Sequence, residues 1–309
     1  VSRAISLAMI FYRPILLVLV AVMFASTSAR ATMTEAEVAL GAHDYVAARA
    51  LLMDEADNGD ADAQYRLGVL FDRGRGGMAS PKAASVWFSR AAAQGHVAAM
   101  HAIGTYYEIG KGVAQDHVLA SRWYSAAAEV GDAKAQRNLA NLYLNGLGVA
   151  RDYDRAAALL RAALEGGNTR AAKNLGYMYY FGLGVSQDLR EATSLFELGA
   201  AADHATAGFA LGLLYYEGNG VPQSFDVAHR LFLRAADAGH VDAQLMVARM
   251  LAFGEGVLAN QHEAWFWLLL AEAQNPAAAR YYLAKLAPEV LDEARDRAAS
   301  RARNWQPRD

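Results

Sequence analysis

The sequence predicts an all-α fold, a right-handed α-solenoid of helix-turn-helix repeats with a 36-residue period. A Gly-x-Gly pair and two alanine positions recur at this constant step without an insertion. Each unit contains two helical segments, and a hairpin of this size covers its apolar face only by stacking on its neighbours. The glycine pairs are Gly74/Gly76, Gly110/Gly112, Gly146/Gly148, Gly182/Gly184, Gly218/Gly220 and Gly254/Gly256.

A stripe of apolar residues predicts the first helix of a unit. In the second unit Ala99, Ile103 and Tyr107 fall at i, i+4 and i+8, on one face of a helix. Gly104 lies beside Ile103, and a glycine or alanine recurs at its position in every unit. Because glycine in mid-helix costs about 1 kcal/mol relative to alanine, this position predicts the close approach of a neighbouring helix. Gly110 then ends the helix, since glycine tolerates the left-handed conformation of a C-cap.

A capping residue predicts the start of the second helix. Four residues after the second glycine of each pair stands Ser, Asp or Asn, whose side-chain oxygen accepts from a backbone N–H of the first turn. The aromatic residues that recur at the same step, among them Trp87, Trp123 and Trp267, are expected to pack in the core between helices. The six N-cap residues are Ser80, Asp116, Asp152, Asp188, Ser224 and Asn260.

Four parts follow one another along the chain. Residues 1–31 are expected to be a signal peptide and residues 32–58 an N-terminal capping hairpin. Residues 59–274 hold the six repeats, and residues 275–309 the C-terminal capping helices and tail. Both capping segments lack the Gly-x-Gly turn, and the C-terminal one is rich in charge, as the exposed end of a stack requires.

The first segment has the features of a secretory signal. It combines a basic start, an apolar run from Ile15 to Ala25 and the small-residue site Ala29-Arg30-Ala31. A retained membrane anchor is the alternative, although a span needs about 20 apolar residues and this run is shorter. Cleavage after Ala31 removes three arginines and changes the formal charge from −3 to −6. The mature chain is therefore expected in the periplasm or outside the cell.

The composition excludes several classes of protein. A chain that is 54% hydrophobic and 20% charged is not mostly disordered. The absence of cysteine excludes disulfides, thiolate metal sites and a cysteine nucleophile. The near balance of 29 basic and 32 acidic residues argues against a nucleic-acid partner.

The pattern of one unit resembles the Sel-one-like repeat (SLR) family, whose units read A-x3-LG-x2-Y-x2-G-x-GV-x2-D-x3-A-x2-WY-x2-AA-x2-G. The resemblance covers six units, from residue 59 to about residue 274, with local departures such as Leu159-Leu160 in place of Trp-Tyr. It implies an α-solenoid similar to that of tetratricopeptide-repeat proteins. The second unit matches as Ala99-x3-Ile103-Gly104-x2-Tyr107-x2-Gly110-x-Gly112-Val113-x2-Asp116-x3-Ala120-x2-Trp123-Tyr124-x2-Ala127-Ala128-x2-Gly131.

The family resemblance implies a non-enzymatic adaptor. Exported bacterial members are similar to scaffolds or regulators of envelope complexes, so the expected partner is a protein or peptide, including a membrane-bound envelope protein. The expected role is regulation of a sensor or an assembly complex. One alternative is a peptidoglycan- or β-lactam-binding protein with weak hydrolase activity, implied by cysteine-rich relatives whose cysteines are absent here. Another is oligomerisation through the solenoid ends.

No catalytic residue, cofactor site or metal site is predicted. The sequence lacks the G-x-S-x-G, S-x-x-K and H-E-x-x-H motifs, and its Gly-x-Gly pairs read as structural turns because they follow no strand. Three histidines occupy one repeat position just after the turn between units, where a role at the helix start is favoured over metal binding. That position holds His96, His204 and His240 in three units and Asp60, Asp132 and Asn168 in the others.

The resemblance also implies a partner-binding groove, if the first helices line the concave side as in tetratricopeptide repeats. Cations beside Asn amides and Tyr rings suit an extended acidic peptide or a carboxylate terminus. The alternative is that these cations only solvate a helix face. The groove residues are Lys134, Arg137, Asn141, Asn145, Arg170, Lys173, Tyr177 and Tyr180, and the flanking units add His101, Thr105, Glu108, Phe209, Tyr216 and Glu217.

Overall fold

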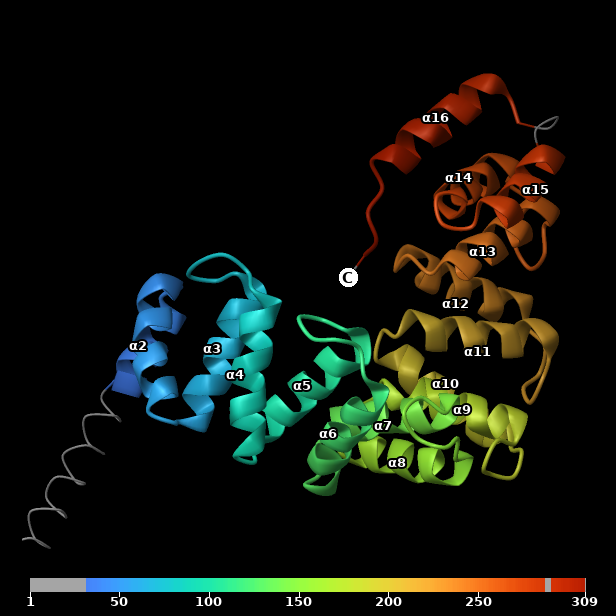
Figure 1. Ribbon diagram of the computed structural model, residues 1–309. Helices are drawn as coiled ribbons and strands as arrows, with labels where there is room; N and C mark the ends of the chain where they lie inside the picture. The colour runs from blue at the N-terminus through green and yellow to red at the C-terminus, as the bar shows by residue number, and fades with distance from the viewer. Residues whose placement is uncertain (1–31, 287–289, 309) are drawn as a thin grey trace, which may run out of the picture. The chain divides into compact units, whose positions relative to one another are not determined.

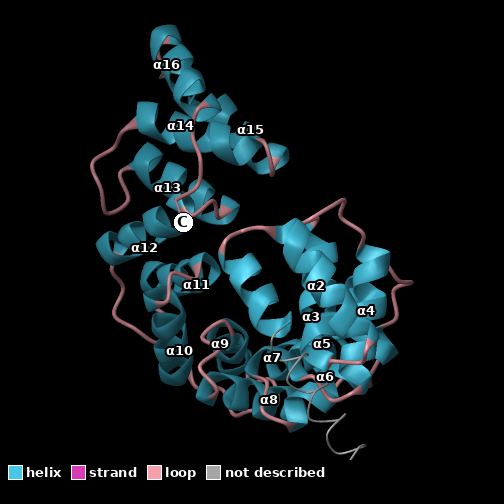
Figure 2. Cartoon of the chain, turned by 90° about the vertical axis from the view of Figure 1, so that its left-hand side faces the viewer, coloured by secondary structure: helices cyan, strands magenta, loops and turns pink. Residues whose placement is uncertain are grey.

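The computed structural model describes residues 32–286 and 290–308. All regular secondary structure in these two ranges is helical and none is strand, which confirms the all-α repeat fold (Figures 1 and 2). None of the helices within them has both the length and the apolar character that a membrane crossing requires. The predicted signal peptide, residues 1–31, lies outside the described residues.

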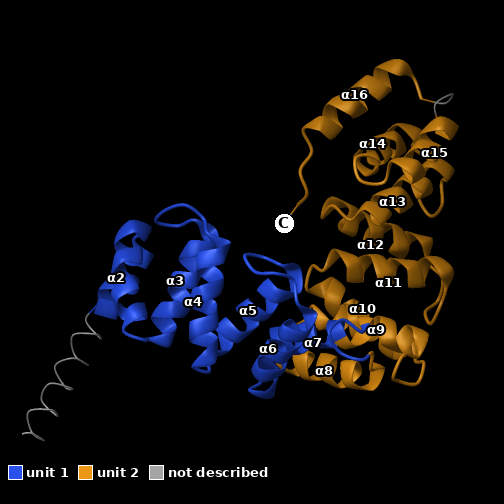
Figure 3. Ribbon diagram, viewed as in Figure 1, with its two compact units in different colours: residues 1–142, 146–150 blue, residues 143–145, 151–309 orange. Residues whose placement is uncertain are grey.

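The chain divides into two compact units (Figure 3). The first contains the residues up to 142 together with 146–150. Residues 32–41 are helical and turn back at residues 42–43, near the turn expected at Gly41. The helices that follow are α2 (Tyr45–Asp57), α3 (Ala61–Arg73), α4 (Pro81–Ala93), α5 (Val97–Ile109), α6 (His117–Glu129) and α7 (Ala133–Asn145), whose last three residues belong to the second unit.

The second unit contains residues 143–145 and the chain from residue 151 onward. It begins with the second helix of the third repeat and continues with the helix pairs of the three repeats that follow. Two further helices then pack on α14, the last repeat helix. Its helices are α8 (Tyr153–Glu165), α9 (Ala171–Phe181), α10 (Leu189–Ala201), α11 (Ala205–Glu217), α12 (Phe225–Asp237), α13 (Val241–Phe253), α14 (Gln261–Glu272), α15 (Pro276–Leu286) and α16 (Asp292–Arg303).

The helices begin and end at the capping residues that the sequence predicted. The first glycine of each Gly-x-Gly pair is the left-handed C-cap of its helix, with φ between 64° and 72°. All six predicted N-cap side chains accept a hydrogen bond from a backbone N–H of their helix. Asp116, for example, accepts from the N–H of Leu119 at 2.9 Å.

In four of the six repeats, the glycine in the middle of the first helix makes room for an aromatic ring rather than for a backbone. A Cβ added at Gly212 would lie 2.6 Å from the ring of Phe232, which is fully buried. Where the ring is replaced by Leu160 or Leu268, the glycine is replaced by Ala140 or Ala248. The other glycine–ring pairs are Gly68–Phe88, Gly104–Tyr124 and Gly176–Phe196.

The core of the first unit corrects one expectation. Tyr124, and not its neighbour Trp123, is the fully buried ring of α6, and Trp123 is only partly buried against the edge of the core. Tyr124 is the ring that faces Gly104 of α5, since successive residues of a helix point about 100° apart. Trp87 and Trp267 are buried as expected.

Candidate functional site

The predicted groove residues lie on two helices that belong mainly to different units. The three residues Lys134, Arg137 and Asn141 are on the part of α7 in the first unit. The second unit contains Asn145, the last residue of α7, and the four residues of or next to α9, which are Arg170, Lys173, Tyr177 and Tyr180.

On α7, Lys134 is exposed, whereas Arg137 and Asn141 are partly buried. The Arg137 guanidinium donates to the side-chain oxygen of Asn138 at 2.8 Å. Asn138, which is buried, also shares a hydrogen bond with Nε2 of His101 at 3.2 Å. Arg137 is thus held in a polar network that links α7 to α5. Burial lowers the pKa of His101, and the positive charges of Lys134 and Arg137 act in the same direction.

A second polar network lies on α5 and α6. The Tyr124 hydroxyl donates to the Glu108 carboxylate at 2.5 Å and lies 3.0 Å from the Thr105 hydroxyl. Burial raises the pKa of the Tyr124 hydroxyl, and the hydrogen bond to Glu108 raises it further. Thr105 and Glu108, which were expected to flank the groove, are therefore committed to interactions within the unit.

On α9, Arg170 is exposed and the other three predicted residues are partly buried. The Tyr177 ring meets the edge of the Phe196 ring at 5.1 Å. Burial raises the pKa of Tyr177, and the Asp242 carboxylate at the start of α13 adds to this rise.

Side-chain hydrogen bonds and an ion pair between successive repeats, which we call ties, were not predicted from the sequence. Each joins the penultimate residue of a first helix to the middle residue of the next Gly-x-Gly turn, 39 residues later. The interacting groups differ among the three contacts, although the two repeat positions are the same. The pairs are Asp72 with the Lys111 ammonium at 2.6 Å, Tyr180 accepting from the Asn219 amide at 2.9 Å, and Tyr216 donating to the Glu255 carboxylate at 2.7 Å.

The ties shift the acidities of the groups that form them. Burial alone would raise the pKa of Asp72, but hydrogen bonds from Lys111 and the Tyr106 hydroxyl outweigh burial and lower it. Burial and the hydrogen bond to Glu255 raise the pKa of Tyr216 to about 12. Tyr180, predicted as a groove residue, is therefore also a structural residue, because its hydroxyl joins two repeats.

Histidines start two of the helices, as expected. Nδ1 of His96 accepts from the N–H of Ala99, and Nδ1 of His240 accepts from the N–H of Ala243. His204 makes no such cap hydrogen bond to α11. The His240 ring also stacks on the Phe209 ring at 4.6 Å. In the part of the chain that the structure describes, no group of three or more His, Asp or Glu side chains is placed to hold a metal ion.

The capping role of His240 predicts a loss of stability in acid. Burial lowers its pKa from the ordinary 6.5, more than the Asp242 carboxylate raises it, and Lys173 lowers it too. The folded state therefore prefers the neutral ring, so its stabilising contribution is complete above about pH 6.5 and declines below it. Burial also lowers the pKa values of His101 and His229. We expect the free energy of unfolding, measured with urea, to fall on acidification.

His240→Asn isolates the contribution of this ring. Asparagine keeps a capping oxygen, as Asn260 does at the start of α14, but cannot be protonated in this range. The variant should show a shallower dependence of stability on pH between about 7 and 5 than the wild type. An unchanged slope would contradict the proposed titration of His240.

Comparisons with known proteins agree with the repeat structure. A family model described as Sel1 repeat matches six consecutive segments, residues 61–96, 97–132, 133–168, 169–204, 206–240 and 241–276. A Sel1 repeat protein from Oxalobacter formigenes is 29% identical, with a TM-score of 0.74, over 79% of this chain and 98% of that chain. No curated protein matches the sequence.

A second solved structure is similar over more of this chain. It is c5321, a protective antigen present in uropathogenic Escherichia coli strains and displaying an SLR fold. It is 29% identical, with a TM-score of 0.70, and the match covers 88% of this chain. The match covers 61% of c5321, so this chain spans about three fifths of that protein.

Proposed function

Since the chain belongs to the Sel1 repeat family, we propose that it is an exported, non-enzymatic scaffold that holds a protein or peptide partner in the bacterial envelope. Sel1 and tetratricopeptide-like repeat folds commonly mediate protein–protein interactions and are typically not catalytic. The features of residues 1–31 support export. The binding surfaces in this proposal are the exposed faces of the first helices, that of α7 in the first unit and that of α9 in the second, and the scaffold regulates the complex that it holds.

The observation that supports this proposal is a set of basic side chains that form no ion pair with a carboxylate. Lys134 on α7, and Arg170 and Lys173 at α9, make no ion pair with a carboxylate in the described ranges. On a chain with an acidic net charge, cations of this kind favour an acidic partner. A carboxylate gains charge-assisted hydrogen bonds from them, and partly exposed rings such as Tyr177 supply contact area.

Site-specific photo-cross-linking in intact cells tests the surface. A photoreactive amino acid at Tyr177 should capture a discrete partner, whereas the same group at Glu197, which is exposed on α10, should not. The triple variant Arg137→Ala/Lys173→Ala/Tyr177→Ala, with the photoreactive group placed at Asn145, should reduce capture at least about tenfold, because two charge-assisted contacts and a ring contact are lost.

The controls separate binding from folding. Circular dichroism of the triple variant should retain the helical signal of the wild type. Arg190→Ala/Glu197→Ala, which removes exposed charges from α10, should leave capture unchanged. Equal capture by the triple variant and the wild type would exclude this face as the binding surface. Recovery of the chain in the cytoplasmic fraction alone would exclude export.

A further inference from the structure

The end of the chain folds back along the second unit. Helix α16 is held on α14 by Arg301, whose guanidinium binds the Glu263 carboxylate at 2.5 and 2.9 Å and lies over the Phe266 ring at 3.6 Å. After Arg303 the chain leaves the helix. Residues 304–308, which we call the tail, then run back past α14 and α13 (Figure 1).

The tail docks where α12 ends and the chain turns into α13. The N–H of Arg308 donates to the carbonyl oxygen of Asp237 at 2.8 Å, and the Arg308 guanidinium lies 3.2 Å from the Asp237 carboxylate. The Pro307 ring covers Gly239 so closely that a Cβ at Gly239 would lie 3.3 Å from it. Main chain, arginine and proline are thus each recognised, as in the binding of an extended peptide.

The arginine of the tail replaces a partner that the repeats do not supply. Asp57 and Asp237 occupy the same repeat position, five periods apart, and Asp57 pairs with Arg90 of the next repeat at 3.6 Å. The residue equivalent to Arg90 beyond Asp237 is Leu270, which is buried. The Asp237 carboxylate pairs instead with Arg308, which comes from outside the repeats, at 3.2 Å.

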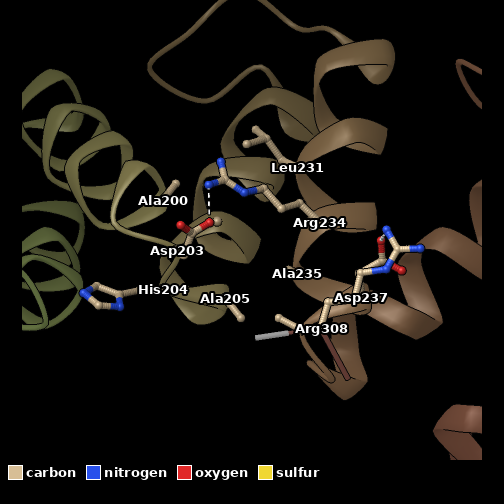
Figure 4. A pocket seen from close by; sticks show the side chains of 11 residues that line it. Ala200, Asp203, His204, Ala205, Leu231, Arg234, Ala235, Asp237 and Arg308 are labelled. Atoms are coloured by element: carbon tan, nitrogen blue, oxygen red, sulfur yellow. Dashed lines mark hydrogen bonds and ion pairs between the residues drawn. The ribbon is translucent and has the colours of Figure 1, made fainter. Parts of the chain in front are cut away.

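A cavity of about 420 Å³ opens beside this contact. Its wall is apolar and small, with Ala200, Ala205, Leu231 and Ala235, and two ion pairs stand at its sides (Figure 4). These are Arg234 with Asp203 and Arg308 with Asp237. Because Arg308 itself lines the cavity, a partner peptide bound in the manner of residues 304–308 would place the residues that follow its arginine beside the cavity.

We propose that this surface, the turn edge formed by residues 202–204 and 237–239 with the cavity between them, binds an extended Pro-Arg segment of a partner protein, and that the tail occupies it in the resting state. The site is separate from the first-helix face of the proposed function. The Arg308 side chain is 80% exposed and that of Asp237 only 24%. The carboxylate is therefore fixed in the surface, while the tail is held weakly, since exposed ion pairs add little net free energy.

A partner segment can gain contacts in the cavity beside Arg308. Apolar residues after its arginine fill the cavity, and the burial of apolar area favours the complex. The tail competes as a tethered ligand at an effective concentration of about millimolar. Removing Arg308 should therefore expose the site without disturbing the repeats.

Fluorescence anisotropy with a synthetic peptide tests the proposal. The probe is fluorescein-labelled Trp-Gln-Pro-Arg-Leu-Leu-amide, and the matched control peptide has alanine in place of arginine. The full chain carrying Arg308→Ala should bind the probe at least about tenfold more tightly than the wild type, and should bind the control peptide much more weakly. Adding Asp237→Asn should abolish this gain.

Thermal unfolding and light scattering complete the test. The melting temperature of the Arg308→Ala chain should stay close to that of the wild type. An unchanged melting temperature together with no binding of the probe would overturn the proposal, and so would equal affinity for the two peptides. A wild-type chain that dimerises with concentration, and loses the dimer on Arg308→Ala, would overturn it in favour of tail exchange between two copies.

Discussion

Gly212→Ala should destabilise the protein by about 2–3 kcal/mol, although alanine is the better helix former by about 1 kcal/mol. The added methyl group would lie 2.6 Å from Cε1 of Phe232, and real Cβ contacts of that length do not occur. The ring cannot turn away, because Phe232 is fully buried between α11 and α12. The two helices must therefore move apart, which disturbs the packing of both.

The chain offers both a control and a rescue for this prediction. Gly208→Ala on the same helix places its methyl group 3.9 Å from the nearest side chain, so it should be neutral or stabilising. Gly212→Ala combined with Phe232→Leu reproduces the Ala248 and Leu268 combination of the following repeat. Urea unfolding of the four members of this cycle should give a favourable coupling of at least about 1 kcal/mol. Additive effects would contradict the pairing of ring and glycine.

Gly112→Ala should cost about 3 kcal/mol or more. Gly112 is the second glycine of its turn and has a φ of +71°, where a residue with a Cβ loses about 1–2 kcal/mol. Its added Cβ would also lie 2.4 Å from the carbonyl carbon and oxygen of Pro81, the first residue of α4 in the preceding repeat. Backbone atoms cannot rotate away as a side chain can, so the turn must withdraw from the repeat on which it packs.

Gly95→Ala separates the cost of the positive φ from the cost of the steric clash with the preceding repeat. Gly95 has a φ of +87°, but a Cβ there meets no atom within 4 Å. We therefore expect only the conformational cost of about 1–2 kcal/mol. Equilibrium unfolding of the two variants, followed by circular dichroism, should show the difference as the contribution of repeat-to-repeat contact. If the two substitutions lowered the free energy of unfolding equally, the contact between the Gly112 turn and the preceding repeat would contribute nothing to stability.

Much of the fold could be predicted because it depends on local rules repeated in phase. The N-cap at Asp116 and the C-cap at Gly110 need only the residues around them, and the 36-residue step fixes the remaining caps by repetition. Trp123 and Tyr124 were both expected on the core side of their helix, and the degree of their burial was not predictable. Both neighbours are aromatic, and the pattern alone does not tell which of them faces Gly104.

The candidate site was less predictable because its contacts join distant parts of the sequence. Tyr180 and Asn219 lie 39 residues apart, and the periodic pattern conceals their contact, because other repeats carry different residues at the same two positions. Arg308 and Asp237 lie 71 residues apart and have no periodic relation.

The ties between repeats also restrict how this array can be rearranged. Lysine at the turn suits an aspartate one unit earlier, and glutamate at the turn suits a tyrosine. Shuffling the units would bring unmatched neighbours together, for example the Glu255 turn against Asp72, where two carboxylates would repel one another. The copies share a shape, but the repeats joined by these three contacts are not chemically interchangeable.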